Sequence, residues 1–146
     1  MMTIATTLAS VLLSISTLFS FDRERIIEFD QLPQVSQEFI QANFPSHEIS
    51  YIIEENELTH TTYDVKFTNG DNIEFRGNGE WKEIDCEYNN IPDSAVPSQL
   101  LDYVKAKHPK NMIEKLSREY NRYEVELNNG LEIVFNSNFE VLRYDD

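Results

Sequence analysis

The chain is organised around the stretch Tyr63-Asp64-Val65-Lys66-Phe67-Thr68-Asn69-Gly70-Asp71-Asn72-Ile73-Glu74-Phe75. Apolar and polar side chains alternate on either side of Asn69-Gly70, which is typical of β-strands with one buried face. An Asn-Gly dipeptide is favoured where both central residues of a two-residue turn need positive φ. The stretch therefore predicts a β-hairpin, and the side chains expected on its buried face are Tyr63, Val65, Phe67, Ile73 and Phe75.

Nearly the same pattern occurs 60 residues later, in the stretch Tyr123-Glu124-Val125-Glu126-Leu127-Asn128-Asn129-Gly130-Leu131-Glu132-Ile133-Val134-Phe135. The sequence therefore predicts a second hairpin, and we interpret the chain as an internal duplication. The side chains expected on the buried face of this hairpin are Tyr123, Val125, Leu127, Ile133 and Phe135. Both sets of residues describe a hydrophobic core and not an active site.

A helix is predicted before each hairpin. Within residues 32–45 the apolar side chains recur at spacings of three and four, which places them on one stripe of a helix. Pro33 fits the first helical turn, where its missing N–H costs no hydrogen bond. Pro45 disfavours helical geometry at the residue before it and predicts the end of the helix. The same arrangement recurs at residues 96–109.

Each copy also has a predicted strand between the helix and the hairpin, near Ile49 and Ile113, and ends in a further predicted strand, at residues 80–85 and 140–145. A unit of roughly sixty residues with one helix would be marginally stable alone, so we expect both copies to share one antiparallel sheet with the helices on one face. The predicted fold class is α+β, with two tandem units of one helix and four strands each. The predicted boundaries are an extended lead-in at 21–29, a first copy at 30–87 and a second copy at 88–146.

The N-terminal segment is the longest stretch of the chain without a charged residue. Residues 1–20 carry no charge and include an apolar run from Ile4 to Phe19. The segment resembles a secretory signal peptide, although the positively charged start of such peptides is absent; an uncleaved N-terminal anchor is the alternative. We therefore expect a periplasmic or secreted protein that contacts the membrane only through this segment.

The chain is acidic, with a formal net charge of −14 over 146 residues. Residues 30–85 hold 12 acidic and 3 basic side chains, so the first copy carries most of the excess. Such a surface repels the phosphates of nucleic acids, because affinity for them comes mainly from Lys and Arg. Nucleic acid is therefore excluded as a partner, whereas cationic partners and divalent cations stay open. A solvated acidic surface without a partner is the simplest interpretation.

No sequence motif for catalysis or cofactor binding is present. The chain has no glycine-rich phosphate loop, no Cys or His pair at metal-ligand spacing and no Gly-x-Ser-x-Gly sequence. The single cysteine, Cys86, cannot form an internal disulfide, and as a nucleophile it would need a histidine brought close by folding. A carboxylate pair acting as in glycosidases stays open as an alternative. We expect no enzyme, no cofactor and no metal site.

The most acidic short stretch is residues 54–62, in which Glu54, Glu55 and Glu57 could offer oxygens to a cation. The stretch lacks the Asp/Asn ladder and the glycine of a dedicated calcium loop, which favours a solvated turn. Binding of a small ligand or cation by residues Glu54 to Glu57 is therefore the alternative function.

The aromatic content of the chain is 12%, and its single tryptophan, Trp81, is predicted at a strand start between charged neighbours. Trp, Tyr and Arg side chains dominate the energetic hot spots of protein interfaces, so a half-exposed Trp81 would mark a binding face. The alternative is that Trp81 covers the edge of the core. The candidate protein-binding residues are Trp81, Lys66, Glu74 and Arg76.

Several motifs together resemble the PepSY-like proteins of bacteria, which are exported and carry the motif set twice. The motifs of the first copy are Leu32-Pro33, Phe39-Ile40, Phe44-Pro45, Tyr63-x-Val65, Asn69-Gly70, Ile73-x-Phe75 and Gly79-x-Trp81. The resemblance covers residues 30–146. In the second copy Phe139 stands where Gly79 stands in the first, and Val141 replaces the tryptophan.

The resemblance implies a fold similar to that of the β-lactamase inhibitory protein, with one concave antiparallel sheet, and it supplies no catalytic residues. The expected function is a non-enzymatic exported module that binds a protein or peptide through the open sheet face. A peptidase or another hydrolase is the kind of partner that the resemblance suggests. The sequence does not identify the partner, and we expect a monomer.

Overall fold

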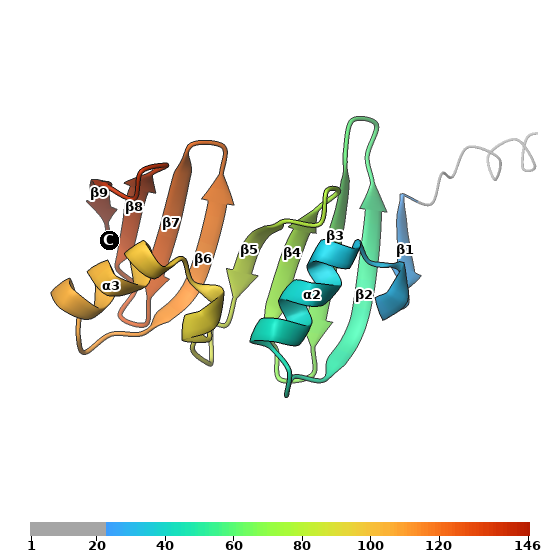
Figure 1. Cartoon of the computed structure of the whole chain (residues 1–146), viewed down its shortest axis with the longest axis horizontal. Coiled ribbons are helices and arrows are strands. Elements are labelled where there is room, and N and C mark those ends of the chain that lie inside the picture. Colours follow the sequence, from blue (N-terminus) through green and yellow to red (C-terminus); the bar gives the residue numbers. More distant parts are fainter. Residues whose placement is uncertain (1–22) are drawn as a thin grey trace, which may run out of the picture.

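The computed structural model describes residues 23–146, and the predicted signal peptide at residues 1–20 lies outside the described part. The described chain forms one antiparallel sheet of nine strands, whose spatial order follows the sequence from β1 to β9 (Figure 1). The strands are β1 (Glu24–Ile27), β2 (Ile49–Asn56), β3 (Thr61–Phe67), β4 (Asn72–Arg76), β5 (Trp81–Asp85), β6 (Ile113–Glu119), β7 (Arg122–Leu127), β8 (Glu132–Asn136) and β9 (Val141–Asp145).

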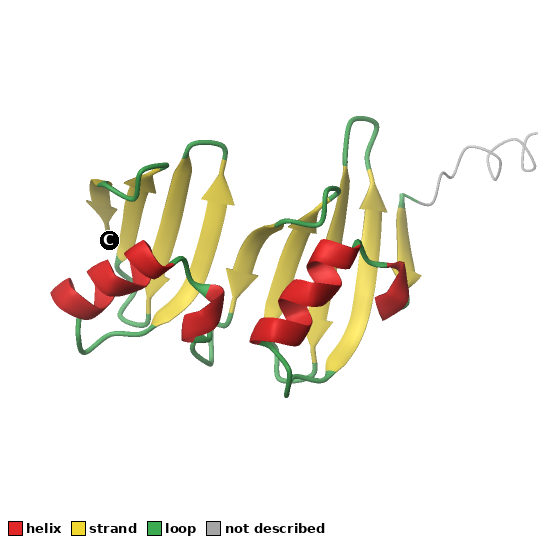
Figure 2. Ribbon diagram, in the orientation of Figure 1, coloured by secondary structure: helices red, strands yellow, loops and turns green. Residues whose placement is uncertain are grey.

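Two short α-helices and two single 3-10 turns complete the described structure. The helices are α2 (Gln34–Asn43) and α3 (Ser98–Lys107), and the 3-10 turns are η1 (Phe29–Gln31) and η2 (Asp93–Ala95). Both helices lie over the same face of the sheet (Figure 2). The prediction of a helix before each hairpin is confirmed, and α2 ends before Phe44-Pro45, where the proline disfavours a further helical residue.

The predicted fold class, two tandem units of one helix and four strands each, is wrong. The molecule is a single nine-stranded sheet and is mostly β, so the α+β assignment is right only in part. Residues Glu24–Ile27 of the expected lead-in form a ninth strand that pairs with β2, because Ile27 enters the core with 5% of its surface exposed. The residue bounds 30–87 and 88–146 for the two copies stay a prediction.

The sheet continues through its middle by a short ladder between β5 and β6. This ladder has three residue pairs, Glu83 with Ser117, Ile84 with Leu116 and Asp85 with Lys115. Pairing at this point satisfies backbone groups that would otherwise be left open at two sheet edges. The three-pair ladder is the shortest in the sheet; the ladder between β2 and β3 has seven pairs.

Both predicted hairpins form, with β3 paired to β4 and β7 paired to β8, but their turns differ from the predicted type. In the first hairpin the Phe67 N–H donates to the Asp71 carbonyl at 2.9 Å, and the Gly70 N–H donates to the Phe67 carbonyl at 3.1 Å. Gly70 has φ +93°, whereas Asn69 does not have a positive φ. The loop is therefore a type I turn followed by a left-handed glycine, and Asn69 stabilises it by accepting the Asp71 N–H at 3.0 Å.

The hydrophobic core lies between the helices and the sheet face that they cover. Phe75, Ile84, Leu116 and Phe135 each have no exposed surface and belong to one contiguous cluster. The opposite face, which we call the open face, carries the polar residues that alternate with them. The predicted alternation thus places the core correctly and leaves one face of the sheet free of helices.

The N-terminal turn of α2 packs closely on the β4–β5 turn. Ser36 is fully buried, and its Oγ donates a hydrogen bond to the Gly79 carbonyl at 2.8 Å. Gly79 has φ +88°, and a Cβ at this position would lie 2.8 Å from the Pro33 Cβ. Only glycine satisfies both conditions, so Gly79 fixes the position of the helix on the sheet.

Candidate functional site

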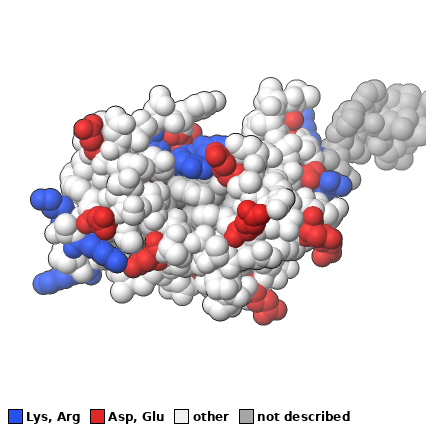
Figure 3. All heavy atoms as spheres, in the orientation of Figure 1, with Lys and Arg blue, Asp and Glu red and all other residues white. Residues whose placement is uncertain are grey.

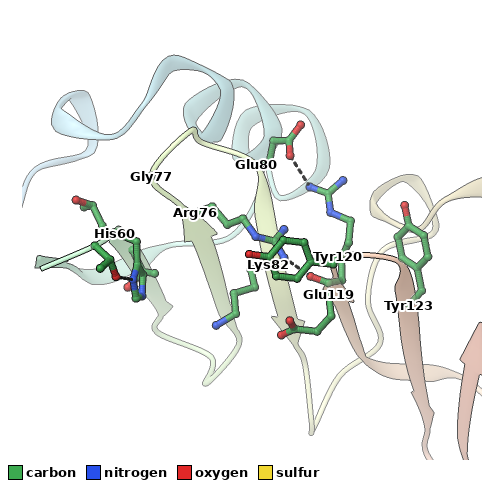
Figure 4. A pocket seen from close by; sticks show the side chains of 12 residues that line it. His60, Arg76, Gly77, Glu80, Lys82, Glu119, Tyr120 and Tyr123 are labelled. Carbon is green, nitrogen blue, oxygen red and sulfur yellow. Dashed lines mark hydrogen bonds and ion pairs between the residues drawn. The ribbon is translucent and has the colours of Figure 1, made fainter. Parts of the chain in front are cut away.

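A cleft of about 830 Å³ lies at one end of the sheet, where the β2–β3, β4–β5 and β6–β7 connections meet. The β2–β3 and β6–β7 hairpins extend beyond the β4–β5 turn that lies between them (Figure 1). We call this space the hairpin cleft. Its lining comprises residues 59–62, Arg76, Gly77, Glu80, Lys82, residues 118–120 and Tyr123 (Figure 4).

Basic side chains line the hairpin cleft, in a molecule that is acidic as a whole. Figure 3 shows Lys and Arg atoms in a hollow at the upper edge of the molecule, flanked by carboxylates. The basic residues of the lining are Arg76, Lys82 and Arg118, and the acidic ones are Glu80 and Glu119. The lining therefore has one positive charge in excess, in a chain whose formal net charge is −14.

Arg118 is held in a fixed position by contacts with Trp81 and Glu80. Its Nη2 donates to the Trp81 carbonyl at 2.9 Å and to Glu80 Oε2 at 3.4 Å. The centre of its guanidinium also lies 4.5 Å from the centroid of the Trp81 ring, which is a cation–π contact. Three contacts on one side chain make Arg118 a well-ordered wall of the cleft.

Trp81 lies on the helix-covered face and not with the other candidate residues. It is 8% exposed, pairs with Phe75 across β4 and β5, and packs 6.5 Å from the Tyr123 ring. The interpretation that Trp81 covers the core is therefore confirmed, because its indole has almost no free surface. Trp81 contributes to the cleft indirectly, as the support of Arg118.

The other three candidate residues, Lys66, Glu74 and Arg76, lie on the open face, with Lys66 and Arg76 at opposite ends of the β3–β4 ladder. They belong to β3 and β4 and alternate with the core residues Val65, Ile73 and Phe75. Glu74 is bound to Lys82 at 2.8 Å, and this hydrogen bond raises the pKa of Lys82 above its ordinary value.

Arg76 differs from the other basic residues of the lining in its partners. Its Nη2 donates a hydrogen bond to the backbone carbonyl of Arg118 in β6. The Arg76 side chain therefore reaches across the start of β5, which lies between the two strands. Within residues 23–146 no carboxylate oxygen lies within 4.0 Å of its guanidinium, whereas Lys82 pairs with Glu74 and Arg118 with Glu80. Figure 4 shows the Arg76 side chain extending into the cleft. The unpaired positive charge of the lining is thus that of Arg76.

Ion pairs are frequent on the open face from β5 to β9, whereas at β1 and β2 this face carries the apolar side chain of Ile26, which is 75% exposed, together with Tyr51 and Ile53. Lys115 lies 3.2 Å from Glu83 and 3.9 Å from Asp85, and the open face also carries the pairs Arg122–Glu124 and Arg143–Asp145. Towards β8 the acidic groups are in excess, and partial burial together with nearby Glu124 raises the pKa of Glu132. From β3 to β9 the open face is therefore a charged surface whose basic groups, apart from Arg76, have acidic neighbours.

The acidic stretch at residues 54–57 does not form a common ligand set. Glu54 is 8% exposed and accepts hydrogen bonds from Arg25 at 2.9 and 3.1 Å, which lower the pKa of Glu54. Glu55 follows it in β2 and points to the opposite face, and Glu57 lies 3.5 Å from His60. Three carboxylates with three separate environments do not converge on a cation, and residues 23–146 contain no cluster of His, Cys, Asp or Glu arranged for a metal ion.

A second polar cluster joins Cys86 to Asp71 and His47, but on the inside of the molecule. Cys86 has no exposed surface, and burial, followed by the charge of Asp71, raises the pKa of its thiol. Asp71 is 2% exposed, accepts from Asn69 and Asn89 at 3.0 Å each, and lies 3.2 Å from His47 Nε2. A buried thiol with a raised pKa is a poor nucleophile, so this cluster joins three chain segments and does not form a catalytic centre.

The sequence did not predict the hairpin cleft as a site. Arg76 and Arg118 are 42 residues apart and come together only through the β5–β6 ladder, for which the sequence gives no signal. Tyr120 was also missed. It lies between two strands and is fully exposed, and tyrosine is one of the residue types enriched in the hot spots of protein interfaces. Of the predicted residues only Arg76 lines the cleft directly.

The comparisons with known proteins identify the family. Residues 61–143 match the family model described as "Putative beta-lactamase-inhibitor-like, PepSY-like". The chain shares 37% identity and a TM-score of 0.82 with a solved structure from Bacteroides vulgatus, described as "a putative periplasmic protein from DUF2874 family", over 87% of this chain and 100% of that one. None of the curated proteins matches the chain.

Two further solved structures are similar over nearly their whole lengths. A protein of Bacteroides thetaiotaomicron described as "a putative calcium-regulated periplasmic protein" is 31% identical, with a TM-score of 0.82, over 86% of this chain and 98% of that one. A second protein of Bacteroides vulgatus, described as "a putative periplasmic protein of unknown function", is 33% identical with a TM-score of 0.78 over 84% and 99%.

Among residues 23–146 no helix has the length and apolar character needed to cross a bilayer. The family model covers more than half of the chain, and the solved relatives exceed 30% identity over almost all of their residues. The chain therefore belongs to the PepSY-like family.

Proposed function

We propose that this chain is a non-enzymatic binding module of the periplasm that takes a protein or peptide partner at the hairpin cleft and the adjoining open face. The observation that carries the proposal is the hairpin cleft itself, about 830 Å³ in volume and lined by arginine and tyrosine side chains. Arg and Tyr are among the residue types that contribute most binding energy at protein interfaces.

Export to the periplasm is supported by two independent features. Three relatives of 31–37% identity are described as periplasmic. The uncharged residues 1–20 have the composition of a secretory signal peptide. A periplasmic location would place the cleft among exported proteins and the segments that they expose.

The absence of an enzymatic role is supported by how the reactive groups are used. The thiol of Cys86 is buried, and Asp71 is already bound by two asparagine side chains and lies beside His47. None of these three groups lines the hairpin cleft. The cleft is lined instead by charged and tyrosine side chains, among which Arg and Tyr favour recognition of a partner.

A protein or peptide fits the cleft better than a cation held by Glu54 to Glu57. Glu54 is committed to Arg25 and Glu57 lies beside His60, so the alternative function has no preformed ligand set. Tyr120 stands fully exposed at the rim of the cleft, where a partner would cover it. Inhibition of a hydrolase by such binding stays a prediction from the resemblance.

The proposal is tested by site-specific photo-crosslinking in the native envelope. A photoreactive phenylalanine analogue is placed at Tyr120 in one variant and at Tyr88, which is 82% exposed and outside the cleft, in a second. We expect a defined crosslinked species from the Tyr120 variant and none from the Tyr88 variant. Crosslinking that is equal at both positions, or absent at Tyr120 in a folded protein, would show that the cleft is not the binding surface.

A further inference from the structure

We infer that the hairpin cleft recognises a carboxylate group of a peptide segment, which Arg76 binds through two parallel hydrogen bonds. This inference rests on the proposed function and adds the chemistry of the partner. The ligand class is therefore an acidic peptide, either through an Asp or Glu side chain or through its C-terminal carboxylate.

The first argument is the distribution of partners among the basic residues of the cleft. Lys82 binds Glu74 at 2.8 Å, and Arg118 is committed to Glu80 and Trp81. Arg76 has the backbone carbonyl of Arg118 as its hydrogen-bond acceptor and no carboxylate among the described residues within 4.0 Å. A planar guanidinium has five N–H donors in a fork that matches a carboxylate, so most of its donors remain for a ligand.

The second argument is that neither acidic group of the lining is paired with Arg76. Glu80 lies 3.4 Å from Arg118, and Glu119 forms no ion pair among the described residues. A ligand carboxylate at Arg76 would give this guanidinium the charged partner that Lys82 and Arg118 already have.

The third argument concerns geometry. The Arg76 guanidinium is anchored at one end by the Arg118 carbonyl, and the Arg118 side chain is itself fixed by Trp81. An arginine that is already positioned loses little conformational entropy when it binds, and this favours a bidentate pair over a mobile surface contact. The net charge of −14 does not oppose this contact strongly, because charges beyond about 8 Å are screened at physiological ionic strength.

The experiment uses random heptapeptides as the probe. A synthetic N-acetylated library is prepared with amidated C-termini and, separately, with free C-termini, and each is selected on the immobilised wild-type protein and sequenced by mass spectrometry. The variants are Arg76→Gln, Arg76→Lys and, as a matched control with the same loss of charge, Arg143→Gln in β9. Thermal unfolding of each variant verifies that it is folded.

We expect the wild-type protein to enrich peptides with Asp or Glu from the amidated library, or peptides of any charge only from the free-carboxylate library. The Kd of individually synthesised hits should rise about tenfold or more for Arg76→Gln, because a charge-assisted bidentate pair is lost. Arg76→Lys should bind with intermediate affinity, and Arg143→Gln should bind as the wild type does.

The possible results separate the two claims. Peptides retained at the cleft without acidic enrichment in either library, or with the same Kd for Arg76→Gln, would overturn the carboxylate inference and leave the proposed function intact. Failure to retain any peptide above background, together with the absence of crosslinks at Tyr120, would overturn both.

Discussion

The guanidinium of Arg118 stacks on the ring of Trp81 at 4.5 Å and donates a hydrogen bond to the carbonyl of the same residue at 2.9 Å. The two residues lie on neighbouring strands, β5 and β6, and are 37 positions apart in the sequence. The ring of Trp81 thus packs in the core and also supports Arg118 of the cleft, so a substitution of this side chain affects both.

Replacing Trp81 by alanine should destabilise the fold strongly. The indole is 8% exposed, and removal of a buried tryptophan leaves a cavity that costs about 3–5 kcal/mol of unfolding free energy. Urea unfolding followed by circular dichroism measures this loss. Tyr120→Ala is the control, because its fully exposed ring predicts a change within about 0.5 kcal/mol. A Trp81→Ala protein as stable as the wild type would show that the indole is not part of the core.

The two glycines Gly79 and Gly130 allow a strain effect to be separated from a packing effect. Both have positive φ, at +88° and +87°. A Cβ at Gly79 would lie 2.8 Å from Pro33 Cβ, whereas a Cβ at Gly130 would have no neighbouring atom within 4 Å. Gly130→Ala should therefore cost about 1 kcal/mol for the left-handed backbone. Gly79→Ala should cost about 2–4 kcal/mol, since α2 must also move. Equal losses in urea unfolding would exclude close packing of α2 on the β4–β5 turn.

The Arg25–Glu54 pair predicts a defined pH dependence of stability. Because Arg25 lowers the pKa of Glu54, the pair stabilises the folded state above the ordinary carboxyl pKa of 4.5 and ceases to do so as pH falls through the lowered folded-state value. Glu54→Gln should cost about 1–2 kcal/mol at pH 7. The difference from the wild type should shrink in acid.

The control for this prediction is Glu55→Gln, on the opposite face of β2. Glu55 has no ion pair in the described structure, so its replacement should change the melting temperature little at any pH. If the Glu54→Gln and wild-type curves stay parallel from pH 7 to acid, the ion pair contributes nothing to folding stability.

Cys86 should be unreactive in the folded protein. Its thiol is fully buried and its pKa is raised, so little thiolate exists at neutral pH. A thiol-specific chromogenic disulfide reagent at pH 8 should label the folded chain at a rate at least about a hundredfold below that in urea, because labelling requires opening of the structure. Rapid labelling under native conditions would place the thiol at the surface.

The alternation around Asn69-Gly70 was enough to predict both hairpins and most of the core, because a period of two follows directly from strand geometry. The turn type was wrong because Asn69 satisfies the Asp71 N–H with its side chain, which favours a type I turn with a left-handed Gly70. The same turn forms at residues 136–140, where Phe139 adopts φ 63° and stacks on Tyr123 at 5.1 Å. Phe139 thus has the positive φ that glycine usually provides, and its ring is packed against Tyr123 in this conformation.

The face of Trp81 could not be read from alternation. A bulge opposite Glu74 and Phe75 breaks the period in β5, so that Trp81 and Ile84, three positions apart, both face the core. The ninth strand and the register of the β5–β6 ladder were missed for a different reason, although a sheet shared by the two copies was expected. Both depend on which backbone N–H and C=O groups remain unpaired at the strand edges after the hairpins form. The alternation of apolar and polar side chains does not indicate which edges these are.

The short ladder between β5 and β6 also has a mechanical meaning. Three residue pairs hold the middle of the sheet, and the bonds of Arg76 and Arg118 cross the same line at the cleft end. Because this ladder is the shortest in the sheet, we expect the two ends of the molecule to twist about it more easily than about the longer ladders. A partner bound in the cleft would contact residues 59–62 on one side and residues 118–120 on the other. It would therefore restrict the motion of these two sides relative to each other. Binding in the cleft would then increase the resistance of the whole sheet to twisting.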